Sequence, residues 1–381
     1  MSLFSTDSSG EPVRAPLTYR KQPKRVSIGW TLISIALILV VVMSIAPAPY
    51  VIEQPGPVFN TLGYDRAIGA SDKHDEKPQT LITVPDRTTY PTSGALDLLT
   101  VQVAGTPEHL PSWLDVMSAW FAPSKAVIPV DVAFPPGTST KEQQQQNAQE
   151  MTNSQHDAIA AALNQLGYDF PQKLEVAYVY PGSPADSVFE KGDQITAVNG
   201  SPVAGTQSLR DAIAKNGSHT AAKVSIVRDG KQQTVSLTPT TSSGQSILGV
   251  GVTMDYSFPF TVDIKLDDVG GPSAGQMFAL GIIDKLTPGA LNGGKKVAGT
   301  GTIDNEGNVG AIGGIRQKMY GAKDAGATYF LAPRANCDEV SGHVPDGLHV
   351  FAVKTLDDSL AVLDALREGT STSQLPTCRA S

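Results

Sequence analysis

The sequence has few charged residues, few aromatic residues and only two cysteines. Charged residues make up 17% of the 381 positions and aromatic residues 6%, and the formal net charge is −8. An acidic chain without a large basic surface is poorly suited to nucleic acid, so we expect no nucleic-acid partner. No two of the six histidines have the spacing of zinc ligands, and Cys337 and Cys378 are too far apart to form such a site. We therefore expect no metal and no cofactor.

Glycine and proline, by contrast, are abundant, with 36 and 27 residues. This composition is typical of a loop-rich α+β protein and argues against a long helical bundle. A chain of this length has room for two or three domains.

One long uncharged run occupies residues 26–46. As a helix, its 21 residues would span roughly 30 Å, which is the thickness of the hydrocarbon core of a bilayer. Basic residues precede the run, and the first acidic residue after it is Glu53. The positive-inside rule then predicts a single-pass protein of the cell membrane, with residues 1–25 as a cytoplasmic tail. The alternative is a signal peptide cleaved near Ala46-Pro47-Ala48, but the run is longer than a typical signal core.

The remaining residues would then lie outside the membrane, and so would both cysteines. An oxidising compartment permits a disulfide between Cys337 and Cys378, which would tie the C-terminal tail, residues 369–381, to the last domain. Two unpaired thiols are the alternative, and we favour the disulfide. Residues 47–165 form an extracytoplasmic N-terminal region with strand signals at 50–53, 80–84 and 96–103 and a helix signal over 151–166. Its role stays open.

Residues 166–240 carry a second set of signals. They include Gly182-Ser183-Pro184-Ala185, a Gly-Asp-x-Ile-x-x-Val-Asn-Gly step at 192–200, a helix at 208–214 and a hairpin that turns at Asp229-Gly230. These features resemble a bacterial PDZ domain. The resemblance implies that a peptide adds as a strand beside the helix, with Leu209 and Ile213 lining the groove. Core packing is the alternative role of these two residues. The Gly-Φ-Gly-Φ loop of the family is not visible near residues 166–170, so capture of a free C-terminus stays open.

The last module, residues 241–368, alternates strand and helix signals and contains two segments with chemical potential. Ser273 lies in Gly270-Gly271-Pro272-Ser273-Ala274-Gly275, before an apolar helix whose first amide groups could stabilise an oxyanion. Lys318 lies 45 residues later, on a short helix after Gly313-Gly314. A desolvated lysine can lose its proton near neutral pH and serve as the base for a serine. The alternative is a capping serine and a solvated lysine.

Together these segments resemble the serine and lysine motifs of the Lon protease family. The resemblance implies an α/β proteolytic domain and a Ser-Lys dyad that cleaves protein or peptide substrates. Thr300, in Gly299-Thr300-Gly301, matches the threonine that contacts the active site in that family. Gly271 and Ala274 would support the site as small neighbours of the serine. The whole chain resembles bacterial membrane-anchored proteins that fuse a PDZ domain to a Lon-type domain.

Three alternatives bear on function. Residues 271–275 also fit the Gly-x-Ser-x-Gly turn of α/β-hydrolases, with His349 as a candidate triad member. Residues 289–296 approximate a phosphate-binding loop, but Lys296 stands where Ser or Thr must bind Mg²⁺, so we expect activity without ATP. From another class, the chain could be a membrane adaptor that binds peptides and keeps an inactive protease fold. Lon relatives form rings, so both a homo-oligomer and a monomer stay open.

Overall fold

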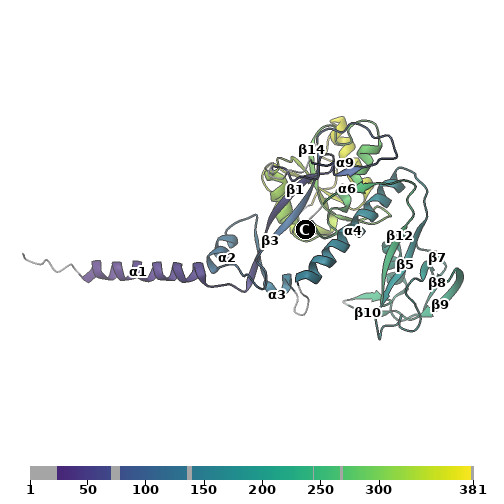
Figure 1. Cartoon of the computed structure of the whole chain (residues 1–381), viewed down its shortest axis with the longest axis horizontal. Helices are drawn as coiled ribbons and strands as arrows, with labels where there is room; N and C mark the ends of the chain where they lie inside the picture. Colours follow the sequence, from purple (N-terminus) through teal and green to yellow (C-terminus); the bar gives the residue numbers. More distant parts are fainter. Residues whose placement is uncertain (1–23, 70–77, 135–139, 243, 267–268, 379–381) are drawn as a thin grey trace, which may run out of the picture.

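The computed structural model describes residues 24–69, 78–134, 140–242, 244–266 and 269–378. Most of the predicted N-terminal tail and the last three residues therefore lie outside the described part. Helix α1 (Lys24–Ile45) stands away from the rest of the molecule (Figure 1). No residue of its stretch Ile28–Ile45 is buried, and the stretch is long and apolar enough to cross a membrane, although a signal sequence would have the same properties.

The first sheet has six strands in the order β18-β17-β14-β3-β1-β4. Strands β3, β14, β17 and β18 run parallel, whereas β1 and β4 are antiparallel additions at one side. The strands are β1 (Tyr50–Asn60), β3 (Ala95–Ala104), β4 (Ala126–Pro129), β14 (Lys296–Gly299), β17 (Tyr329–Pro333) and β18 (His349–Val353). Half of this sheet comes from residues 47–165, the region whose role the sequence left open. The structure thus places that region and the last module in one α/β layer.

Helices cover both faces of this sheet, which explains why β17 is apolar throughout and why β3 is buried from Ala95 to Leu99. Leu96 and Leu98 of β3 face α6 (Gly275–Leu286), α4 (Thr140–Gln165) and α9 (Leu356–Glu368) in one core. Leu99 faces the other core, which contains α7 (Ile315–Asp324). The alternation of side chains along a strand produces this division. Consequently the helix that follows Ser273 and the helix that carries Lys318 lie on opposite faces of the same sheet.

The second sheet contains β12-β5-β6-β8-β9, with β7 paired to β6. Its elements are β5 (Gln172–Val179), β6 (Gln194–Val198), β7 (Ser201–Pro202), α5 (Thr206–Asn216), β8 (Ala222–Arg228), β9 (Lys231–Leu237) and β12 (Val250–Tyr256). We assigned residues 250–256 to the last module, but β12 pairs with β5 along its length, so this module extends beyond the predicted boundary at residue 240. The hairpin turns at Asp229-Gly230 as predicted, and both residues have positive φ, 49° and 73°.

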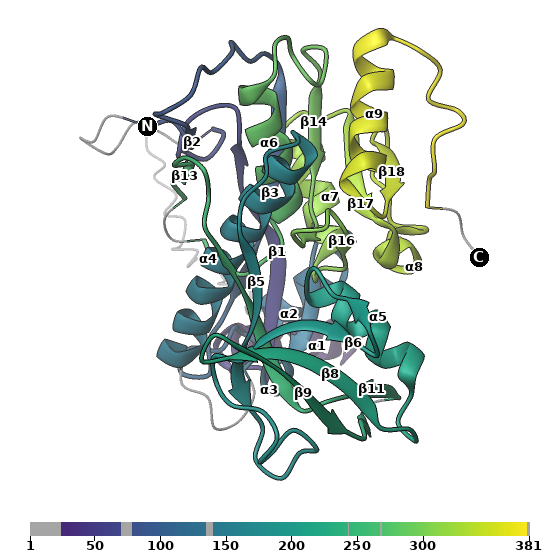
Figure 2. The ribbon, with the colours of Figure 1, turned by 90° about the vertical axis from the view of Figure 1, so that its right-hand side faces the viewer.

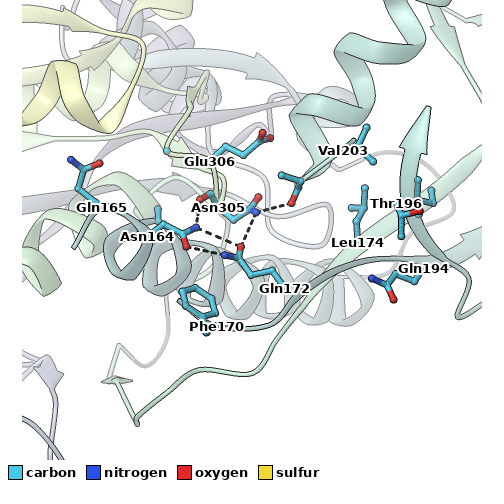
Figure 3. Close-up of a pocket in the computed structure, with 14 residues that line it drawn as sticks. Asn164, Gln165, Phe170, Gln172, Leu174, Gln194, Thr196, Val203, Asn305 and Glu306 are labelled. Atoms are coloured by element: carbon cyan, nitrogen blue, oxygen red, sulfur yellow. Dashed lines mark hydrogen bonds between the residues drawn. The ribbon is translucent and has the colours of Figure 1, made fainter. Parts of the chain in front are cut away.

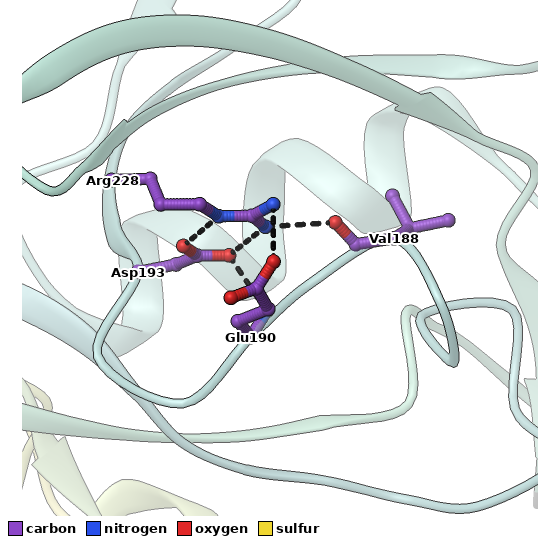
Figure 4. Close-up of polar contacts among 4 residues, drawn as sticks. All are labelled: Val188, Glu190, Asp193 and Arg228. Carbon is purple, nitrogen blue, oxygen red and sulfur yellow. Dashed lines mark hydrogen bonds and ion pairs between the residues drawn. The ribbon is translucent and has the colours of Figure 1, made fainter.

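A buried ion pair holds the second sheet to the loop before β6. Arg228 donates from Nε and Nη2 to the two carboxylate oxygens of Asp193 at 2.7 and 2.6 Å, and Nη2 also donates to the Val188 carbonyl at 2.9 Å (Figure 4). The side chain of Asp193 is 1% exposed, and Arg228 also pairs with the exposed Glu190. A carboxylate so deeply buried needs this bidentate partner.

The two modules meet at the loop between β15 (Thr302–Ile303) and β16 (Val309–Gly310). Asn305 donates to Gln172 Oε1 at 3.0 Å and to the Ala204 carbonyl at 2.9 Å, and Asn164 donates to the Asn305 carbonyl at 2.8 Å (Figure 3). Glu306 accepts from the amide of Ser208 in the first turn of α5. Figure 2 shows β5, β6, β8 and β9 lying beneath the layer that holds α6, α7 and α9.

Short elements complete the described fold, and a disulfide fastens the last residues. They are α2 (Trp113–Trp120), α3 (Val130–Ala133), β2 (Ile82–Thr83), β13 (Asp263–Ile264), β10 (Thr240–Ser242), β11 (Gln245–Ile247), the 3-10 helix η1 (Arg334–Asn336) and α8 (Cys337–Val340). Cys337 and Cys378 are bonded, and the Pro376 carbonyl accepts from the Ala352 amide in β18 at 2.8 Å. The mixture of helices and strands confirms the predicted α+β class.

Candidate active site

Ser273 lies in the tight loop that leads into α6, and α4 fixes that loop. The Gly271 amide donates to the Asn147 carbonyl at 2.9 Å, and Ser154 Oγ donates to the Pro272 carbonyl at 2.9 Å. Gly271 has φ 86°, a conformation that favours glycine. At Gly275, a Cβ atom would lie 2.9 Å from Ser154 Oγ, so the close approach of α4 requires a residue without a side chain.

Lys318 reaches Ser273 from the opposite face of the sheet. Its side chain is buried on α7, and Nζ donates to Ser273 Oγ at 2.8 Å and to Thr300 Oγ1 at 3.1 Å. Thr300 follows the last residue of β14, and its hydroxyl donates to the Ser273 carbonyl at 2.9 Å. The Gly301 amide donates to the same carbonyl. The structure therefore brings together the three polar residues that the motifs singled out.

Burial controls the electrostatics of this cluster. Removal from water lowers the pKa of Lys318 to about 7, because the charged ammonium loses its hydration, and the Glu53 carboxylate opposes that shift. Burial also raises the pKa of Glu53, as does the nearby Glu339, whereas Lys318 lowers it. Near neutral pH an appreciable fraction of Lys318 thus carries a free amine within hydrogen-bond distance of a serine hydroxyl.

Glu53 is a site residue that sequence reasoning missed. It lies on β1, 220 residues before Ser273. In the sequence it is only the first acidic residue after the apolar run, and no motif surrounds it. The pairing of β1 with β3 carries it to the site.

A cavity of about 650 Å³ opens beside Ser273 and Lys318. One wall is β3 from Leu98 to Val103, and the other walls come from the serine loop, β1, α4 and the turn before α7. Its lining includes Glu53, Pro57, Asn147, Met151, Val269, Gly270, Gly271, Pro272, Ala274, Gly313 and Gly314. Strand β14 pairs with β3 from Ala95 to Leu98, and the pairing ends there. Within the described residues, no strand pairs with residues 99–104 on that side, and this edge borders the cavity.

His349 is not part of this site, so it cannot form the Ser-His-Asp triad of an α/β-hydrolase with Ser273. It begins β18, which is separated from β14 by β17, and its ring lies 5.8 Å from that of Tyr329. Its side chain is exposed and does not line the cavity. In the described part of the chain, no group of three His, Cys, Asp or Glu side chains is placed to hold a metal ion.

The second module has a groove of its own. Leu209 and Ile213 of α5 are buried in the core of the module and also line a cavity of about 700 Å³. Its other wall is residues 246–252, which read Ser-Ile-Leu-Gly-Val-Gly-Val. The alternation of glycine and apolar residues that we sought near residues 166–170 is therefore found at Gly249-Val250-Gly251-Val252, near the C-terminal end of the module. We missed it because the predicted boundary excluded these residues.

Comparisons with known proteins agree with both modules. A family model for the PDZ domain matches residues 148–238, and one for the Lon protease (S16) C-terminal proteolytic domain matches residues 268–366. The chain is 40% identical over 95 residues to Lon protease 2 of Herpetosiphon aurantiacus and 30% identical over 118 residues to Lon protease 1 of Bacillus subtilis. These matches cover 24% and 29% of this chain but only 11% and 15% of the two relatives.

Among solved structures, the PDZ domain of an SdrC-like protein from Listeria monocytogenes is similar, with 22% identity and a TM-score of 0.20. The match covers 21% of this chain and 85% of that structure.

Proposed function

We propose that this chain, which contains a PDZ domain and the proteolytic domain of Lon proteases, is a membrane-anchored serine endopeptidase that acts without ATP on protein substrates outside the membrane. The observation that carries the proposal is the 2.8 Å contact between the buried Lys318 amine and Ser273 Oγ at the wall of a cavity. The depressed pKa of Lys318 supplies a base at neutral pH. Both residues, the cavity and its walls come from this one chain.

In the proposed reaction, the neutral amine of Lys318 accepts the proton of Ser273 as Oγ attacks the substrate carbonyl. The resulting oxyanion would be stabilised by the Gly275 amide, the first of α6, because the next amides, of Gln276 and Met277, already donate to the Gly301 and Ala274 carbonyls. Lys318 then gives its proton to the leaving amine as the peptide bond breaks and an acyl-serine remains. Lys318 then takes a proton from a water molecule as its oxygen attacks the acyl carbonyl, and it returns that proton to Ser273 Oγ as the bond to the acyl group breaks and the acid leaves. Thr300 positions both groups, because its hydroxyl accepts from the Lys318 amine and donates to the Ser273 carbonyl.

Substrate would enter as an extended chain. Among the described residues no strand pairs with residues 99–104 of β3 on the cavity side, so a polypeptide can pair there as an additional strand and present a carbonyl to Ser273. Strand β12 is likewise at the edge of its sheet, beside Leu209 and Ile213, and could take a second peptide segment. We propose that the PDZ groove recruits the substrates that the dyad cleaves.

For the membrane, we propose that α1 is a retained anchor with its N-terminus in the cytoplasm. Its exposed apolar surface and the basic residues before it support this topology.

The test uses the full chain in nanodiscs, an unfolded protein substrate and no ATP, with fragments identified by mass spectrometry. Ser273→Ala and Lys318→Ala should each lower the cleavage rate by about 10³-fold or more, because the two residues act as a unit. Lys323→Ala, at an exposed position on the same helix, is the matched control and should cleave normally. Labelling by a serine-directed probe should be lost only in Ser273→Ala and Lys318→Ala.

Cleavage that survives in Lys318→Ala but not in Ser273→Ala would refute the lysine as base. No cleavage and no labelling of the wild-type chain, together with peptide binding at the PDZ groove, would favour the adaptor function instead.

A further inference from the structure

Helix α2 is apolar on two opposite faces. Val116 and Ala119 are buried against Ala48 and Ile52, and they form the inner face. Leu114, Met117 and Phe121 follow at helical spacing on the outer face and are 43%, 37% and 83% exposed. A helix that buries one apolar face and exposes another has a surface that water does not favour.

The position of α2 indicates what covers this outer face. The Trp113 amide donates to the Ala46 carbonyl one residue after α1 ends, and Pro47 forms an isolated bridge with Ser112. The ring of Tyr50 packs edge-on against Trp113 and Trp120. In Figure 1, α2 lies beside the end of α1, between that helix and the sheets. These contacts hold the start of α2 against the residues that directly follow α1.

We propose that the outer face of α2 docks on the lipid bilayer that holds α1, at the boundary between head groups and acyl chains. This inference rests on the proposed membrane anchor. Trp120, which is 58% exposed, would lie at the same level. Tryptophan and phenylalanine favour this boundary, and helices with an exposed apolar face lie in its plane. The start of α2 is bonded to the residue that follows α1, so the outer face lies near the point where the proposed anchor would leave the bilayer.

The charges near α2 define the kind of binding. Asp115 is engaged in the cap of the helix with Ser112, and exposed Glu108 precedes the helix. No basic residue lies within α2. Lys125 is the only lysine or arginine between residues 103 and 130. The docking is therefore driven by apolar burial, and it should depend little on the fraction of anionic lipid in the membrane.

Docking would hold the active site close to the bilayer. Glu53 lines the cavity and lies three residues after Tyr50, at the start of β1. At the rise of a strand, three residues correspond to roughly 10 Å. A peptide at the edge of β3 would thus be cleaved close to the head groups.

The test uses tryptophan emission from the full chain in nanodiscs whose lipids carry bromine, which quenches nearby indoles. The chain has three tryptophans. Trp30→Phe with Trp113→Phe leaves Trp120 alone, and Trp113→Phe with Trp120→Phe leaves Trp30 alone in the anchor. Trp120 should be quenched about twofold or more by bromine near the glycerol end of the acyl chain, and less by bromine at mid-chain.

Variants then test the face itself. The triple substitution Leu114→Ser, Met117→Ser and Phe121→Ser should abolish the quenching of Trp120 and leave that of Trp30 unchanged. Tyr178→Ser with Tyr180→Ser, at exposed aromatic positions of the PDZ module, is the matched control and should change neither.

The outcomes separate docking from anchoring. Quenching of Trp30 without quenching of Trp120 would overturn the docking and leave the anchor intact. Quenching of neither would overturn both. Emission of Trp120 that responds to protein concentration and not to brominated lipid would show that a second copy of the chain covers the face, which also overturns the proposal.

Discussion

At the scale of single residues, the protonation state of Lys318 controls the proposed reaction. Burial lowers its pKa to about 7, and only the neutral amine can accept the serine proton. Activity should therefore rise with pH, with kcat/KM increasing about tenfold per pH unit below pH 7 and levelling off above it. A pH–rate profile of the full chain on a quenched peptide measures this. A rate that is constant between about pH 6 and pH 9 would contradict the assignment of the base.

Glu53 should influence the pH at which activity rises, through its effect on the pKa of Lys318. Its carboxylate raises the pKa of Lys318, so its removal lowers this pKa further. Glu53→Gln should move the acidic limb toward lower pH and raise the relative rate at pH 6. Glu108→Gln, at an exposed position remote from the cavity lining, serves as the control. A limb that stays in place would show that Glu53 does not act on the lysine.

These residues differ in how far the sequence predicts them. The motifs around Ser273, Thr300 and Lys318 are local, because each residue is flanked by the small residues and helix starts that its position needs. The resemblance of these motifs to those of the Lon family therefore implied that the three meet, and the structure places Lys318 Nζ 2.8 Å from Ser273 Oγ. Glu53 has no such surroundings. It reaches the cavity through the register of β1 on β3, and no short stretch of sequence encodes that register.

At the scale of elements, the stability of the second sheet should depend on the ion pair between Arg228 of β8 and Asp193 in the loop before β6. Burial raises the pKa of Asp193, but the hydrogen bonds from Arg228 and from the Glu190 amide outweigh it, and the net pKa lies below the usual range. Arg228→Ala would leave this carboxylate buried and unpaired, and it should cost about 3–5 kcal/mol of unfolding free energy. Thermal or urea unfolding measures the loss.

Two further variants separate charge from packing at this pair. Arg228→Met combined with Asp193→Asn should destabilise less than Arg228→Ala, because no buried charge is left. Lys231→Ala, at the exposed start of β9, should have little effect. Because the folded pKa of Asp193 is lowered, its contribution is present above its unfolded pKa and is lost as pH falls through the folded value. Equal losses for the single and the double variant would refute this account.

Element boundaries were harder to predict than the elements. The helix signal begins at Met151, where apolar residues recur, yet α4 begins at Thr140 because exposed glutamines continue the same helix. Strand β1 continues through Pro55-Gly56-Pro57, which has the composition of a turn. The register on β3 shifts there, and β4 pairs only with Tyr50 to Glu53. A proline without a donor is tolerated at such an irregular edge.

At the scale of the whole molecule, long-range pairing decides the organisation. The predicted boundaries divided the chain where composition and turn signals change. However, β3 pairs with β14 about 200 residues later, and β12 returns to β5 across the entire second module. The second module is therefore inserted between two parts of one sheet. This connection places the β15–β16 loop, which follows Thr300 and Gly301, against the start of α5.

The same organisation predicts which peptide bonds the enzyme reaches. The proposed anchor α1, the α2 face and β1, which lines the cavity with Glu53, follow one another closely along the chain, so an active site docked as proposed should prefer segments near the membrane. Single-pass substrates in the same nanodisc, with one cleavable segment at increasing distance from their own anchor, should be cleaved fastest within about 10–20 residues and at least about tenfold more slowly at 60 residues.

The comparison with a soluble version of each substrate isolates the effect of position. Without an anchor the segment has no fixed height above the bilayer, so the linker length should no longer change the rate. The triple substitution in the α2 face should flatten the dependence for anchored substrates while leaving soluble ones unaffected, because it releases the ectodomain and leaves the dyad untouched. If the wild-type chain cleaves all anchored substrates equally, the active site moves freely on its tether and the bilayer does not select the substrate.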